Sequence, residues 1–226
     1  MATSLRSALV STAFWRTLRT YFGAVRGRRG KRIADYEALQ HFLASRSSHV
    51  AQTALYGYLR TRAGTRFPEL FDDDDFARSI NFAKWHVWLA CLSDLSVYAG
   101  GLLIQRSHAS CALVEQVMSV AVEAVLSGTG NPDDAGPEFA QDADRVGARL
   151  LNCDWASVQD SETPFSRSPE ALVHWAPVID EFKLEDDEII RNSVRFRWQE
   201  VRRDLRRDLD ANALMASATL AREDTT

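Results

Sequence analysis

The chain has 226 residues, 46% of them hydrophobic, which is enough to bury one sizeable core. Its three cysteines lie far apart, and their odd number argues against a disulfide-stabilised secreted domain and favours reduced thiols in the cytoplasm. The net charge of −4 is unevenly distributed. Residues 1–34 hold eight of the 27 basic groups and no acid, which leaves 19 basic and 31 acidic groups on residues 35–226.

Residues 1–34 are predicted to form a basic amphipathic arm. Apolar side chains recur at helical spacing over 4–25 with arginines off that stripe, and a basic cluster follows at 27–32. The pattern favours docking on an anionic membrane surface or a protein partner. An ordinary packed helix or a cleaved targeting segment are the alternatives. The expected docking residues are Trp15, Arg16, Leu18, Arg19, Phe22, Arg26, Arg28, Arg29, Lys31 and Arg32.

A helical domain is expected over residues 35–210. It begins with a helical pattern over 35–62, for which Gly64 is a plausible C-cap. Four consecutive aspartates at 72–75 then precede a strongly apolar segment, 76–98, and aspartate is favoured at an N-cap and in a first turn. This segment is apolar nearly all round, which predicts a central core helix.

Residues 85–104, which overlap the apolar segment and extend beyond it, approach the length of about 20 residues that a membrane span needs. His86 and Asp94 lie within this stretch, however, and an aspartate at the bilayer centre costs about 2.5–3.5 kcal/mol on insertion scales. We therefore interpret the segment as a buried helix of a soluble bundle. Gly100 and Gly101 are expected to loosen or end it.

Three shorter helices are predicted in the middle of the chain, with a breaker-rich loop at 127–137 and an irregular stretch at 152–168 between them. Trp155 and Phe165 are expected to hold that irregular stretch on the body. The three helices are predicted over residues 111–126, 139–151 and 169–175.

The segment 189–209 has the clearest helical pattern in the chain, with apolar residues three or four apart, acids before it and arginines towards its end. We expect it to be the long C-terminal helix, followed by a tail, 211–226, that frays. No alternating strand pattern of useful length occurs. The predicted fold is all-α, an irregular bundle of about six to eight helices.

Signatures of catalysis or metal binding are missing from the sequence. It contains no Gly-x-Ser-x-Gly elbow, phosphate-binding loop, His-Glu-x-x-His or Glu-x-x-His motif. His108, Cys111 and Glu115 share a helical face but lack the fourth ligand of a structural zinc site. No metal and no cofactor are therefore expected.

Two groups of residues are weighed as binding sites. A pocket between central helices would be lined by Trp85, His86, Trp88, Asp94 and Tyr98. Structural polar contacts are the favoured interpretation of His86 and Asp94, with Lys84 or an arginine of the last helix as the partner of Asp94. The arginine stripe of the last helix could contact anions, although interleaved acids favour ion pairs within the chain. That stripe consists of Arg191, Arg195, Arg202 and Arg206.

Together these features favour a non-enzymatic helical interaction or regulatory protein. It would dock through the arm on the anionic cytoplasmic face of a membrane or on a larger complex, while nucleic-acid binding is not expected because the body is acidic. The alternative is an enzyme or small-molecule-binding protein with a pocket around His86 and Asp94.

Overall fold

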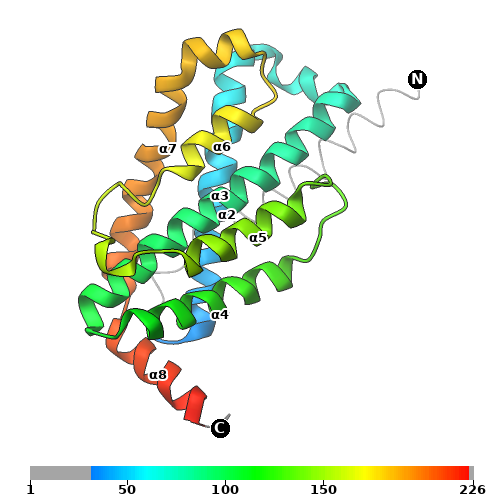
Figure 1. Ribbon diagram of the computed structural model, residues 1–226. Helices are drawn as coiled ribbons and strands as arrows, with labels where there is room; N and C mark the ends of the chain where they lie inside the picture. The colour runs from blue at the N-terminus through cyan, green and yellow to red at the C-terminus, as the bar shows by residue number, and fades with distance from the viewer. Residues whose placement is uncertain (1–31, 224–226) are drawn as a thin grey trace.

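The computed structural model describes residues 32–223, with side chains described as far as residue 219 (Figure 1). Among these residues the prediction of an all-α bundle of six to eight helices is confirmed, because seven α-helices and no named strand are present. Two 3₁₀ helices complete the fold. The elements are α2 (Tyr36–Ala63), η1 (Gly64–Asp72), α3 (Asp74–Ser107), α4 (Cys111–Thr129), α5 (Phe139–Leu151), η2 (Trp155–Ser157), α6 (Arg167–Trp175), α7 (Asp180–Asp208) and α8 (Ala211–Glu223).

Helix α3 lies in the middle of the bundle and contacts α2, α4, α5, α6 and α8 (Figure 1). The predicted aspartate cap is confirmed, since the Asp73 side chain accepts hydrogen bonds from the backbone N–H groups of Asp75 and Phe76. Within the described part of the chain, α3 and α4 are long and apolar enough to cross a membrane. The apolar window of α3 is 89% buried inside the protein, as a core helix requires.

The expected break at Gly100 and Gly101 is wrong, because α3 continues through both residues to Ser107. The two glycines serve close packing instead. A Cβ atom at Gly100 would lie 2.2 Å from Cζ3 of Trp155, and one at Gly101 would lie 2.4 Å from Cγ1 of Val158. The loop after α5 therefore packs directly on the backbone of α3.

The sequence predicted only the C-terminal part of α7, because this helix begins nine residues before the expected start at residue 189. It is followed by a short extended contact in which Ile33 N–H donates to the carbonyl of Asp208 (2.8 Å) and Asp210 N–H donates to the carbonyl of Ile33 (3.0 Å). Instead of the expected frayed tail, residues 211–223 then form α8. The reason is burial, because Leu214 is fully buried and α8 contacts α3.

Candidate ligand-binding site

A cavity of about 890 Å³ lies between α3, α5, α6 and the loop that joins α5 to α6. Helix α3 contributes His86, α5 contributes Asp142 and Arg145, and α6 contributes Arg167 and Trp175. The cavity mixes these polar groups with apolar side chains from the same helices. Its size falls within the range of roughly 300–1,000 Å³ that is usual for small-molecule pockets.

His86 is held in this cavity by contacts on two sides of its ring. Its ring stacks on Trp175 with 3.8 Å between ring centroids and 9° between ring planes. Its Nδ1 atom lies 2.6 Å from Oδ2 of Asp142, whose Oδ1 accepts a hydrogen bond of 2.5 Å from Arg145. The His86 side chain is only 1% exposed, and its Nε2 atom has no hydrogen-bond partner among the described residues.

Asp94 lies about two helical turns after His86 on α3. It is fully buried, but it does not line the cavity. Its carboxylate accepts hydrogen bonds from Arg149 Nη1 (2.6 Å), from the hydroxyl of Ser168 (2.7 Å), and from the backbone N–H groups of Arg167 (3.2 Å) and Ser168 (2.8 Å). Burial raises the pKa of Asp94, and the charge and hydrogen bonds of Arg149 with those of Ser168 oppose that rise. These contacts join α3 to α5 and α6.

The expected partners of Asp94 are wrong. Lys84 pairs instead with Asp134 at 3.1 Å. No arginine of α7 reaches Asp94 among the described contacts, because Ser168 of α6 lies between: Trp198 of α7 donates to the Ser168 hydroxyl at 2.9 Å. The arginine that pairs with Asp94 comes from α5.

The five residues predicted to form a pocket are not brought together, and only His86 lines this cavity. Trp85 donates to Asp134 at 2.6 Å and packs edge-to-face on Trp88, whereas Tyr98 donates to Asp160 at 2.7 Å. At about 100° per residue, positions 85, 86, 88, 94 and 98 point to different sides of one helix. Closeness in sequence therefore did not produce a common site.

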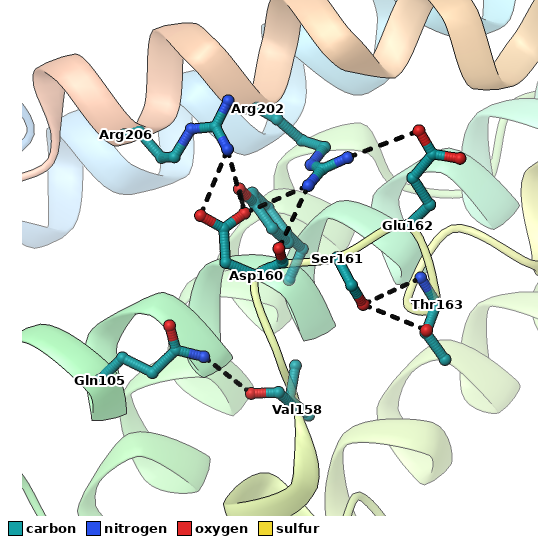
Figure 2. Close-up of polar contacts among 9 residues, drawn as sticks. Gln105, Val158, Asp160, Ser161, Glu162, Thr163, Arg202 and Arg206 are labelled. Atoms are coloured by element: carbon teal, nitrogen blue, oxygen red, sulfur yellow. Dashed lines mark hydrogen bonds and ion pairs between the residues drawn. The ribbon is translucent and has the colours of Figure 1, made fainter.

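One wall of the cavity is the loop 157–164, which is held from outside by the arginines of α7 (Figure 2). Arg202 and Arg206 each donate to Oδ1 of Asp160 at 3.2 Å, and Arg202 also pairs with Glu162 at 3.7 Å. Gln105 of α3 donates to the carbonyl of Val158 at 2.9 Å. The loop is therefore fixed by contacts from two helices.

Asp160 is the central acceptor in this loop. Burial alone would raise its pKa, but hydrogen bonds from Tyr98, Arg206 and Arg202 outweigh burial, so that the pKa of Asp160 is lowered. Burial and the hydrogen bond to Asp160 raise the pKa of Tyr98 to about 12. Both shifts favour the ionised carboxylate and the neutral phenol.

This pairing predicts a pH-dependent contribution to stability. Because the folded-state pKa of Asp160 lies below the unfolded value of about 3.9, its stabilisation is present above about pH 4 and is lost as the pH falls through the lowered value. We expect the free energies of unfolding of the wild type and Asp160→Asn to differ at neutral pH and to converge in acid. Urea unfolding at a series of pH values measures this, and a difference that is independent of pH would contradict it.

Of the four arginines considered for anion contacts, three make ion pairs within the chain. Arg191 pairs with Asp187 at 2.7 Å, and Arg202 and Arg206 share Asp160 as described above. Arg195 donates to Oδ1 of Asn192 at 3.2 Å. For Arg191, Arg202 and Arg206, the structure therefore agrees with the interpretation that these side chains form ion pairs within the chain.

Nine of the ten residues predicted to dock on a surface lie outside the described residues, so the docking arm stays a prediction. The exception, Arg32, pairs with Asp210, and the adjoining Ile33 is buried beside Leu209. The point at which the predicted arm joins the body is therefore the junction between α7 and α8.

Sequence reasoning missed the side chains of α5 that complete the site. Asp142, Arg145 and Arg149 are spaced three and four residues apart, which places them on one face of the helix. This polar stripe was the available signal, but its partners His86 and Asp94 are more than fifty residues away.

Among residues 32–219 no group of three or more His, Cys, Asp or Glu side chains is placed to hold a metal ion. Comparisons of the chain with protein-family models, with curated proteins and with solved structures found no match. The candidate site is therefore interpreted from its own geometry.

Proposed function

We propose that this protein binds a small organic anion in the cavity beside His86. The observation that carries the proposal is the buried Nε2 atom of His86, which lacks a partner among the described residues although the ring lines a cavity. A buried polar atom without a hydrogen bond costs about 1–3 kcal/mol, and such atoms are rare in folded proteins. A ligand that enters the cavity and displaces the side chains covering Nε2 would remove that cost by hydrogen bonding to this atom.

The ring of His86 is held in one orientation before a ligand arrives. The Asp142 carboxylate fixes Nδ1, and the stacked Trp175 fixes the plane of the ring. A carboxylate at Nδ1 holds the proton there, which leaves Nε2 of the neutral ring to accept a hydrogen bond. Pre-positioning of this kind lowers the entropy that binding must offset.

Two carboxylates, Asp142 and Glu170, line the cavity together with three arginines, of which Arg145 and Arg167 are exposed and could bind an anion. Arg145 is bonded to Asp142 through one nitrogen, and its side chain is 67% exposed. Arg167 is also exposed, and its side chain makes no ion pair among the described residues. Guanidinium groups bind carboxylates and phosphates with paired hydrogen bonds. Apolar lining from Leu89, Val97 and other residues suits a ligand with an organic body.

Binding is favoured over nucleophilic catalysis. A histidine that activates a serine or cysteine has that nucleophile within hydrogen-bond distance. Within the described structure no hydroxyl or thiol makes such a contact with Nε2 of His86. The Cys153 thiol does line the cavity, but burial raises its pKa, so the reactive thiolate is disfavoured.

The test is a binding screen with a panel of small carboxylates and phosphates, read by calorimetry. Compounds that bind the wild type are expected to bind His86→Phe about tenfold more weakly, since one hydrogen bond is lost while the stack on Trp175 is kept. Arg167→Ala should also weaken binding, and more strongly at low salt. The control is His41→Asn, an exposed position on α2. Equal affinity of the wild type and His86→Phe for every ligand found would refute the proposal.

A further inference from the structure

Helix α7 carries a line of exposed apolar side chains on the side facing away from the core. Phe182, Ile189 and Phe196 are 41%, 66% and 72% exposed, and they are spaced seven residues apart. A spacing of seven drifts by only about 20° per step on an α-helix, so the three form one stripe about 21 Å long. The buried residues of α7, such as Val194 and Trp198, lie on the opposite side. Figure 1 shows α7 along an edge of the bundle.

The two halves of α7 carry opposite charge. The exposed charged side chains of residues 180–188 are all acidic, with a net charge of −4, whereas those of residues 191–207 have a net charge of +2. The first group is Asp180, Glu181, Glu185 and Glu188, and the second is Arg195, Glu200, Arg203 and Arg207. A helix of this kind is complementary to a second copy of itself that runs in the opposite direction. Each acidic half then lies beside a basic half, twice over by symmetry.

We propose that the outer face of α7 pairs antiparallel with α7 of a second copy of this chain. The stripe supplies the apolar contact, with Ile189 of each copy near Phe196 of the other. Beside the stripe, Glu188 and Arg195 are exposed, seven residues apart, and neither makes an ion pair among the described residues. When the antiparallel pair is centred midway between these two positions, Glu188 of one copy lies opposite Arg195 of the other.

Other occupants fit this face less well. The basic arm joins the body at Ile33, beside the arginine-rich end of α7, so its positive cluster would meet like charge there. An anionic membrane would be repelled by the acidic half of the helix. Three large apolar side chains per copy make a small interface, which predicts a weak dimer with a Kd of roughly micromolar order.

The experiment is analytical ultracentrifugation of the full chain from about 1 to 500 µM, a range that brackets this affinity. The single reversals Glu188→Arg and Arg195→Glu each place like charges together at two symmetric positions, and each is expected to weaken dimerisation about tenfold. The double variant Glu188→Arg/Arg195→Glu restores the pairing and is expected to return close to the wild type. Phe196→Ser should abolish dimerisation, whereas Val120→Ser, which alters an exposed apolar residue of α4, should not.

Circular dichroism shows whether each variant is folded, so loss of structure is separated from loss of pairing. A wild type that stays monomeric over the whole range overturns the proposal. So does a double reversal that dimerises no better than either single one. Binding of the wild type but not Phe196→Ser to anionic vesicles, without dimerisation, would assign the face to a membrane instead.

Discussion

Replacing Asp94 with asparagine is expected to lower the free energy of unfolding by about 3–5 kcal/mol, because it removes one partner of a buried ion pair. The Arg149 guanidinium is largely enclosed, with 22% of its side chain exposed, and the substitution leaves it without its counter-charge. Asparagine has nearly the same volume as aspartate, so the loss reports the charge and the hydrogen bonds, not a cavity. Urea unfolding at neutral pH, followed by tryptophan fluorescence, measures the change.

Asp187→Asn is the matched control for this prediction. It removes the carboxylate of an i,i+4 pair with Arg191 on the surface of α7, where 41% of the Asp187 side chain is exposed. Exposed pairs of this type contribute about 0.3–0.5 kcal/mol. A double-mutant cycle of Asp94→Asn with Arg149→Met then isolates the coupling between the two side chains. If Asp94→Asn lowered the free energy of unfolding no more than the surface control does, the buried Asp94–Arg149 ion pair would not be important for stability.

The effect of Asp94 reaches the cavity through the helices that it joins. By accepting the backbone N–H groups of Arg167 and Ser168, it caps the start of α6, whose first N–H groups have no partner within the helix. Helix α6 carries Trp175 onto His86, and α5, held through Arg149, carries Asp142. The buried carboxylate thereby positions both walls of the proposed binding site without lining it.

Local patterns predicted the helices well. The apolar spacing in 139–151 matches α5, and the run of aspartates before α3 matches an observed cap, because both depend on neighbours within a few residues. The start of α7 was missed because residues 180–188 are mostly charged and present little apolar periodicity. Helix α8 was missed because its stability depends on burying Leu214 and Met215 against the body.

The candidate site was predicted only in part. His86 stood out as a polar residue on an apolar helix, which is a local feature that can be read from sequence. Its partners Asp142 and Trp175 lie on two other helices, and no spacing rule links residues 86, 142 and 175. The assignment of Asp94 failed for the same reason, since the order in which α5, α6 and α7 surround α3 is a tertiary property.

Gly100→Ala is expected to lower the free energy of unfolding by about 2–3 kcal/mol, although the same change in an exposed helix interior stabilises by about 1 kcal/mol. The alanine Cβ would lie 2.2 Å from Cζ3 of Trp155, a buried ring with only 3% of its residue exposed, so neither the helix nor the ring can move without disturbing the core. Urea unfolding measures the change.

The control for Gly100→Ala is Gly147→Ala, within α5, where an added Cβ meets no atom within 4 Å. There the helical propensity of alanine acts alone, and stabilisation of up to about 1 kcal/mol is expected. Opposite signs at two helical glycines would show that Gly100 is present for packing and not to end a helix. Because Trp155 lies just before the loop 157–164, which forms one wall of the cavity, Gly100→Ala should also speed amide exchange in this loop. If both substitutions stabilised the protein, the Trp155 ring would have to move away from the added methyl group at little cost in free energy.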